Sequence, residues 1–280
     1  MSSDAGSIPA ASIFFKAMKK KVTLACLVLA ALISAFPSAA GAPSPSRQAQ
    51  AQRTIVIDPG HGGLDVGAKG KFGALEKTIT LIISFKLKAL IEQNLAYRVV
   101  LTRDKDIDVS LENRAALANN NAAALFISIH TNGSFRKRAQ GSETFFMSLN
   151  ASDEETRKLA YMENSSAALE QRIAEEGKDV VKMILWDMAQ TAYIRQSSRL
   201  AEFIQEELSS DPRLKTENRG IKQAPFKVLT GVACPAVLVE AAFISNPEEE
   251  QRLVNDEFQT QIAQAIFGGL ARFIKLTAPK

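Results

Sequence analysis

The chain has 280 residues, of which 46% are hydrophobic and 23% are charged, so it can bury a full core and a disordered chain is excluded. No segment repeats at a fixed period, which excludes solenoids and propellers. The net charge of +4 is concentrated in the first 42 residues, which contain four lysines and one aspartate. The remainder has no basic stripe interleaved with aromatic side chains, so nucleic-acid binding is not supported.

The first 42 residues have the layout of a secretory signal peptide with an N-terminal extension. Lys19, Lys20 and Lys21 precede a nearly uninterrupted apolar run over residues 22–36, and small residues follow at 37–42. The run is shorter than the roughly 20 apolar residues that span a bilayer, and an uncleaved membrane anchor is the alternative. Because no twin-arginine pair is present, we expect the general secretion route to the periplasm or the exterior, with no stable anchor after cleavage.

Residues 43–52 are polar, contain proline and show no periodicity, so we interpret them as a flexible linker. The folded domain is expected at 53–280. Cys26 lies in the leader, which leaves Cys234 as the one thiol of the mature chain and excludes an internal disulfide. Because Cys234 begins an apolar run, we predict a small core residue and not a nucleophile.

Strand and helix patterns alternate along the first part of the domain, which predicts an α/β fold. Two successive β-α-β units are expected, with strands and helices in the order strand 54–57, helix 78–95, strand 97–102, helix 111–119, strand 125–129. A further strand is expected at 141–148, with an edge position in the sheet as one possibility.

The middle of the domain, residues 151–208, is rich in alanine and charged residues and contains a single glycine, Gly177. This composition predicts helix nearly throughout, as two or three helices. Two more strands are expected at 226–229 and 236–239. A helix begins at Asn246 with a proline in its first turn, and the last helix runs through 262–274.

The sequence contains only two histidines, His61 and His130, and each follows a predicted buried strand. Ligands bind at the carboxyl ends of strands in open α/β sheets. Two imidazoles there suit zinc, and a catalytic zinc site takes three protein ligands and keeps one position open. Asp58, Asp65 and Glu76 are the nearest acids, and Glu76 lies at a helix start from which its carboxylate can turn back over the strand ends.

Glu240 is a second conspicuous acid, because it ends the apolar strand at 236–239 and an apolar stretch follows it. Desolvation in such a setting raises the pKa of a carboxyl group toward the range that suits a general base. An unpaired buried acid is costly, so this position favours a functional role for Glu240.

Six motifs in this order resemble the zinc-dependent N-acetylmuramoyl-L-alanine amidases, over a match from about residue 53 to residue 274. They are 54–63 (TIVIDPGHGG), 75–77 (LEK), 101–104 (LTRD), 126–132 (FISIHTN), 239–240 (VE) and 243–246 (FISN). The resemblance implies a mixed, mostly parallel sheet flanked by helices on both faces, in a single zinc-hydrolase domain. It also implies peptidoglycan as the partner and cleavage of the amide between N-acetylmuramic acid and L-alanine, for wall remodelling or daughter-cell separation.

By the same resemblance, His61, Glu76 and His130 fall on the three zinc-ligand positions, with one Zn²⁺ per domain, and Glu240 falls on the catalytic glutamate. Asn132 is a candidate substrate contact, with a simple turn residue as the alternative. Arg103, Asp104 and Arg114 also match the family, but we expect them to fix loop geometry. Thr80 and Ala242 depart from the residues that are common in the family, and we expect no loss of activity from either.

Residues 151–187 form a predicted helical insert. Some members of the resembled family carry a helix here that blocks the zinc cleft until an activator protein moves it, and residues 161–164 (YMEN) are similar to part of that segment. Glu163 is therefore our candidate autoinhibitory residue, and a plain surface helix is the alternative. Two rival functions stay open for the whole chain, a zinc hydrolase of free peptides and an inactive wall-binding domain.

Overall fold

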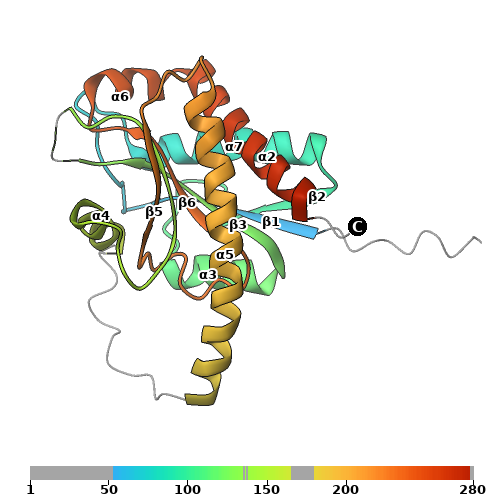
Figure 1. The fold of residues 1–280 in the computed structure, drawn as a ribbon. Helices are drawn as coiled ribbons and strands as arrows, with labels where there is room; N and C mark the ends of the chain where they lie inside the picture. Colours follow the sequence, from blue (N-terminus) through green and yellow to red (C-terminus); the bar gives the residue numbers. More distant parts are fainter. Residues whose placement is uncertain (1–52, 135, 137, 165–179, 278–280) are drawn as a thin grey trace, which may run out of the picture. The chain divides into compact units, whose positions relative to one another are not determined.

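The computed structural model describes residues 53–134, 136, 138–164 and 180–277, so the predicted signal peptide and linker lie outside the described residues. The elements follow in the order β1 (Arg53–Pro59), α2 (Glu76–Asn94), β2 (Tyr97–Leu101), α3 (Leu111–Asn120), β3 (Ala123–Asn132), β4 (Ser142–Met147), α4 (Glu154–Asn164), α5 (Val180–Ser210), β5 (Asn218–Ala224), β6 (Ala236–Phe243), α6 (Pro247–Leu253) and α7 (Asp256–Thr277). Figure 1 shows their arrangement. The α/β prediction is confirmed.

The strands form one six-stranded sheet in the order β2-β1-β3-β6-β4-β5. The four strands β2, β1, β3 and β6 are parallel, and β4 pairs with β6 in the antiparallel direction. β4 and β5 run parallel to each other. The sheet is therefore mixed and mostly parallel, and the carboxyl ends of β1, β3 and β6 meet at one edge.

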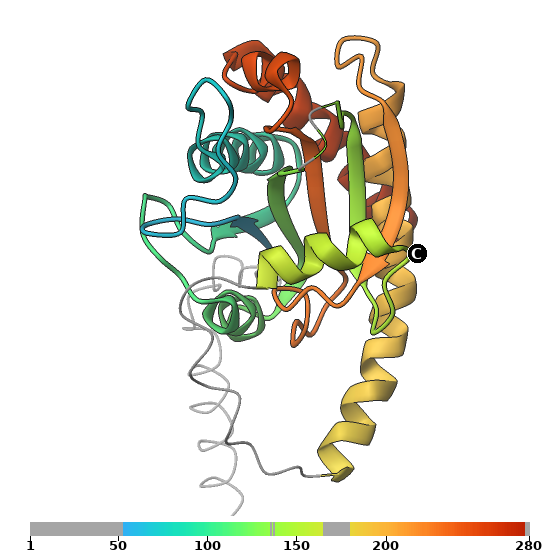
Figure 2. The ribbon, with the colours of Figure 1, turned by 90° about the vertical axis from the view of Figure 1, so that its left-hand side faces the viewer.

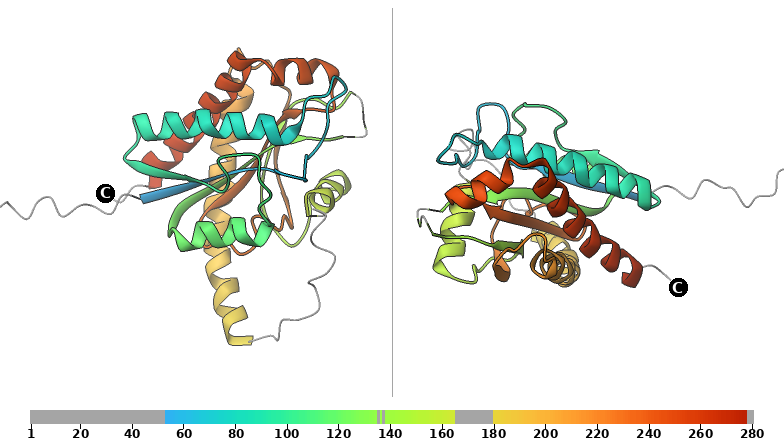
Figure 3. Two further views of the ribbon diagram at one scale, coloured as in Figure 1. Left: turned by 180° about the vertical axis from the view of Figure 1, so that it is seen from behind. Right: turned by 90° about the horizontal axis from the view of Figure 1, so that it is seen from above.

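Helices cover both faces of this sheet (Figures 1 and 2). On one face, Ile57 and Ile127 pack with side chains from α2, α5 and α7, and α2 and α7 lie side by side (Figure 3). On the other face, Phe126 and Phe145 pack with side chains from α3 and α4. α4 thus belongs to the same layer of the fold as α3. No helix in the described part of the chain is long and apolar enough to cross a membrane.

The expected strand at 226–229 is wrong, since the chain turns there and the strand β5 is Asn218–Ala224. Phe226 and Leu229 are nevertheless buried, because their side chains pack in the core on the α3 side of the sheet. The edge position considered for 141–148 is also wrong: β4 lies between β6 and β5, and β5 forms the edge.

Two described helices, α4 and α5, lie within the predicted helical stretch 151–208. α5 begins at Val180, within the predicted insert at 151–187. Residues 165–179 lie outside the described residues, so the insert at 151–187 stays a prediction. Cys234 is buried, which confirms the prediction of a core residue, and desolvation raises the pKa of its thiol to about 12.

Candidate metal-binding active site

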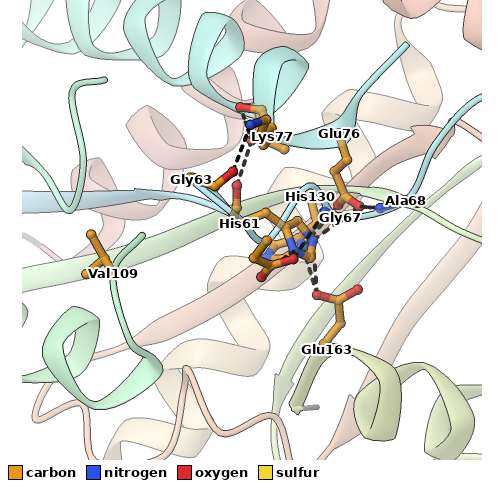
Figure 4. Close-up of polar contacts among 12 residues, drawn as sticks. His61, Gly63, Gly67, Ala68, Glu76, Lys77, Val109, His130 and Glu163 are labelled. Atoms are coloured by element: carbon orange, nitrogen blue, oxygen red, sulfur yellow. Dashed lines mark hydrogen bonds and ion pairs between the residues drawn. The ribbon is translucent and has the colours of Figure 1, made fainter. Parts of the chain in front are cut away.

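Four side chains from four different elements converge at the carboxyl edge of the sheet (Figure 4). His61 follows β1, Glu76 begins α2, His130 lies in β3, and Glu163 lies in the last turn of α4. One ligand atom from each of the four lies within 4.8 Å of the others. The structure therefore brings together the three predicted zinc ligands and the candidate autoinhibitory residue.

Glu76 is 1% exposed, and two backbone groups fix its carboxylate. The amide of Thr131 donates to Oε1 at 2.9 Å, and the amide of Ala68 donates to Oε2 at 2.8 Å. Burial by itself raises the pKa of Glu76, but the two neighbouring histidines hold that pKa well below its ordinary range. Glu76 is thus an ionised carboxylate that is oriented before any cation binds.

His61 presents Nε2 to the centre of the group and its other ring nitrogen to Asp65. Nδ1 lies 3.0 Å from both carboxylate oxygens of Asp65, an arrangement that places the proton on Nδ1 and leaves the Nε2 lone pair free. Nε2 lies 3.1 Å from Glu76 Oε2, yet it is buried without a hydrogen-bond partner among the described residues. The lone pair of Nε2 is therefore available to a bound cation.

His130 completes the donor set from the middle of the sheet. Its Nδ1 lies 3.2 Å from Glu76 Oε1 and 3.1 Å from Glu163 Oε2. Burial lowers the pKa of His130, but the carboxylates of Glu163 and Glu76 raise it to about 10. A Cβ atom on Gly60 would lie 2.5 Å from the imidazole ring, so a glycine is required beside this histidine.

The chemistry of this donor set fits a zinc ion. His61, Glu76 and His130 supply two imidazole nitrogens and one carboxylate, which is a known catalytic zinc ligand set. The carboxylates of Glu76 and Glu163 lie within 3.4 Å of the imidazole nitrogens of both histidines, and this negative charge favours a bound cation. The buried Nε2 of His61 without a hydrogen-bond partner is the atom that such an ion would satisfy.

Glu240 lies beside this group in β6, directly opposite His130 in the parallel pair of β3 and β6. It is 1% exposed, and neither of its carboxylate oxygens has a hydrogen-bond partner among the described residues. Burial raises the pKa of Glu240 well above its ordinary value, and the carboxylates of Glu163 and Glu76 add to that effect. A raised carboxyl pKa is the property that suits such a group to general acid–base catalysis.

Asn132 lies near the site but does not belong to the group that could hold a metal. Its amide nitrogen donates to Glu143 Oε1 at 2.6 Å, and Asn132 and Glu143 line a pocket of about 240 Å³. The sequence reasoning missed Glu143, because its partners are far from it along the chain. It also missed the role of Asp65, whose contact with His61 depends on the fold of an irregular loop.

Arg103 and Arg114 hold the backbone around His61, as expected for residues that fix loop geometry. Arg103 donates to the carbonyl oxygens of Pro59 at 3.0 Å and of Gly60 at 2.8 Å. Arg114 donates to the carbonyl oxygens of Pro59 and His61, both at 2.8 Å. The loop that presents His61 is therefore fixed by two buried guanidinium groups.

Glu163, in the last turn of α4, lies against both histidines of the group. Its Oε2 lies 3.4 Å from His61 Nε2 and 3.1 Å from His130 Nδ1. The next residue, Asn164, donates to the carbonyl oxygen of Pro225 at 2.9 Å and accepts from the amide of Lys227 at 2.7 Å. These two hydrogen bonds fix the end of α4 that carries Glu163.

The family described as N-acetylmuramoyl-L-alanine amidase matches residues 55–272. N-acetylmuramoyl-L-alanine amidase AmiC of Escherichia coli O6:H1 is 34% identical over 85% of this chain and 57% of its own length. The amidase AmiA of Escherichia coli K12 is 34% identical over 81% of this chain and 78% of its own length. The chain thus spans little more than half of the first relative.

A crystal structure of N-acetylmuramoyl-L-alanine amidase from Clostridium difficile 630 has the same fold. It is 29% identical to this chain, with a TM-score of 0.61, and the match covers 81% of this chain and 98% of that one. The six-stranded sheet with helices on both faces is therefore the fold of these enzymes.

Proposed function

The chain belongs to the N-acetylmuramoyl-L-alanine amidase family, and on that premise we propose that it hydrolyses the amide between N-acetylmuramic acid and L-alanine in peptidoglycan, with zinc as its cofactor. The convergence of His61, Glu76 and His130 beside the unpartnered carboxyl group of Glu240 carries this proposal. An inactive wall-binding domain has no need of a buried acid without partners, since such a group costs free energy.

In the proposed hydrolysis, zinc, Glu240 and Asp65 have different roles. When bound, zinc supplies Lewis acidity, which makes a water molecule more acidic and polarises the scissile carbonyl. Glu240 accepts a proton from the attacking water at its carboxylate and, after the amide C–N bond breaks, donates that proton to the leaving amine of L-alanine. Asp65 keeps the proton of His61 on Nδ1, so that Nε2 stays available as a ligand.

We propose further that Glu163 is autoinhibitory. Its carboxylate lies where the open ligand position of the site must be, within 3.4 Å of His61 Nε2. An activator protein would open the site by binding preferentially to the state in which α4 has moved away. A plain surface helix, the alternative, gives no reason for α4 to place a carboxylate against two histidines.

The remaining parts of the proposal concern the whole chain. Residues 1–42 act as the export signal for the general secretion route, residues 43–52 as a linker, and 53–280 as the catalytic domain, with a regulatory helical insert at about 151–187. The site of action is then the periplasm or the exterior, where the enzyme remodels the wall or separates daughter cells.

Release of dye from labelled sacculi, followed by analysis of the muropeptide products, tests the activity. The zinc-loaded enzyme should release stem peptides that begin with L-alanine, and the Glu240→Gln variant should release at least about 100-fold less while it stays folded. Cleavage of free peptides alone would favour the rival peptidase. Binding to sacculi without cleavage would favour the wall-binding domain.

A further inference from the structure

A buried carboxylate with two cations lies next to the site, at the junction of β4 and β5. Glu143 is 2% exposed. Arg219 Nε lies 3.1 Å from Glu143 Oε2, and Lys222 Nζ lies 2.9 Å from the same oxygen. Asn132 donates to the other carboxylate oxygen at 2.6 Å. Glu143 therefore fixes the positions of both cations, which removes much of the entropy cost of binding a further anion.

Two acids at the start of α4 cover the outer side of these cations. Glu155 Oε2 lies 3.4 Å from Arg219 Nη2, and Asp153 Oδ2 lies 3.6 Å from Lys222 Nζ. α4 lies beside β5 (Figure 1), and the side chains of Arg219 and Lys222 are only 18% and 14% exposed. With α4 in place, three carboxylates face two cations, and without α4 only Glu143 would remain.

The cations lie on the face of the sheet that carries the catalytic group. Glu143 is directly opposite Glu240 in the antiparallel pair of β4 and β6, and side chains of directly opposed residues project from the same face. Asn132, which holds Glu143, follows His130 by two residues in β3. A ligand at Glu240 that extends past Glu143 on β4 would therefore reach the cations of β5.

We propose that Arg219 and Lys222 form a subsite for a carboxylate of the stem peptide, and that Glu155 and Asp153 occupy this subsite while α4 is docked. This inference rests on the proposed function. Carboxylate is the ligand class, because carboxylates from α4 now hold the outer side of both cations. The same helix thus covers the metal site with Glu163 and the peptide subsite with its first acids.

Two synthetic N-acetylmuramoyl dipeptides test the subsite. In one, L-alanine is followed by glutamate with free carboxylates, and in the other both carboxylates are carboxamides. The ratio of kcat/KM for the acid over the carboxamide is the readout, because movement of α4 and metal content change both rates together. Calorimetry with the two alanyl dipeptides that lack N-acetylmuramic acid gives the ratio of their dissociation constants. This binding ratio is a second readout of the subsite and needs no turnover.

Arg219→Gln removes one charge-assisted hydrogen bond and should lower this ratio about tenfold, whereas Arg219→Lys should keep most of it. Asp153→Asn with Glu155→Gln should raise both rates together several-fold and leave their ratio unchanged, because the docked α4 loses its contacts with the two cations. Asn is as good an N-cap as Asp, so the amide of Thr156 keeps its capping acceptor. Arg199→Gln removes an exposed cation of α5 and should leave the ratio unchanged.

An unchanged ratio in Arg219→Gln would overturn the subsite, and the two cations would then serve only to dock α4. Unchanged rates in the double variant would overturn the occupation of the subsite by Glu155 and Asp153. Absence of cleavage of either substrate would overturn the proposed function. The binding ratio would still decide whether the subsite exists, so the two failures are distinguishable.

Discussion

His61 has a backbone φ of 60°, a left-handed conformation that costs energy in a residue other than glycine. Arg114 offsets this cost. Its guanidinium donates to the carbonyl oxygen of His61 and, at 2.7 Å, to the buried carboxylate of Asp58. Burial raises the pKa of Asp58, but Arg114 and hydroxyl donors bring that pKa below its ordinary value. The metal ligand and its support thus form one buried unit.

Arg114→Lys should lower zinc affinity by about 10–100-fold, because a single ammonium cannot make the divergent hydrogen bonds of a guanidinium. Competition with a chelating dye measures the affinity. Arg199→Lys, on the exposed side of α5, is the matched control. Equal affinity in the wild type and Arg114→Lys would show that the conformation of His61 does not depend on Arg114.

Two equally buried glutamates should differ in their effect on stability. Replacement by glutamine should raise the Tm at one of them and lower it at the other. Glu240 and Glu250 are each 1% exposed, but Glu250 accepts hydrogen bonds from the backbone amides of Phe72 and Ala74, whereas the carboxylate of Glu240 has no partner among the described residues. Burial raises the folded-state pKa of Glu240 above its unfolded value, so this group destabilises the fold increasingly as pH rises above the unfolded pKa.

At neutral pH, Glu240→Gln should therefore raise the Tm of the metal-free protein by at least about 2 °C, the shift that corresponds to roughly 1 kcal/mol. Glu250→Gln should lower the Tm. The gain from Glu240→Gln should shrink as pH falls toward 4, where Glu240 is protonated in both states. Thermal unfolding across this pH range measures the effect, and a lower Tm for Glu240→Gln at pH 7 would contradict it.

At the scale of elements, α4 has a buried side and an end that places Glu163 against the two histidines. Leu159 and Ala160 pack in the core on the α3 side of the sheet, and Asn164 ties the end of the helix to the turn after β5. The helix can therefore stay docked without Glu163, which makes the removal of this carboxylate a test of blocking alone.

Glu163→Ala should raise basal digestion of sacculi several-fold without a change in zinc content, because the open ligand position is no longer filled. Asn164→Ala should act in the same direction, since it loosens the end of α4. Arg157→Gln, an exposed change on the same helix, is the control. Equal or lower activity in folded Glu163→Ala would show that α4 is scaffold or substrate surface, and that no partner is needed to open the site.

The strands with buried, β-branched sequences could be predicted, and the polar edge strand could not. β5 has the sequence NRGIKQA and buries only its last residue, so no hydrophobic alternation marks it. The turn at 226–229 has an apolar sequence because it fills the core, which made it resemble a strand. The apolar pattern of a segment reports burial, and burial does not require a strand.

The convergence of His61 and His130 could be predicted because His61 follows β1 and His130 lies near the carboxyl end of β3, and these parallel strands bring their carboxyl ends to one edge. The cluster of Glu143 with Arg219 and Lys222 could not be predicted. Its members come from different strands, and charged residues in a polar segment are usually solvated. Only the pairing of β4 with β5 makes them neighbours.

At the scale of the whole molecule, a zinc ion held by His61, Glu76 and His130 would join the loop after β1 with α2 and β3, so it should stabilise the fold. With free zinc at 100 times Kd the gain is about 2.7 kcal/mol, or about 5–10 °C in Tm. The gain should depend on pH. The folded-state pKa of His130 is raised to about 10, so protonation stabilises the metal-free protein fully below the unfolded pKa, and this contribution is lost as pH rises toward 10.

The Tm difference between zinc-loaded and chelator-treated protein should consequently increase from pH 6 to pH 9, because protons compete with the metal. Differential scanning calorimetry at fixed free zinc measures this difference. A zinc-induced shift that is independent of pH would show that the two histidines do not titrate against metal binding.

The metal content of purified protein tests the central claim most directly. Wild type and Glu240→Gln should each contain one zinc per chain, because Glu240 holds no metal. In a Glu163→Ala background, in which no fourth side chain of the described group can replace a lost ligand, His61→Ala and His130→Ala should each contain little zinc, since two protein ligands cannot hold zinc against water. Unchanged zinc content in either folded histidine variant would contradict the assignment of His61, Glu76 and His130 as the metal ligands.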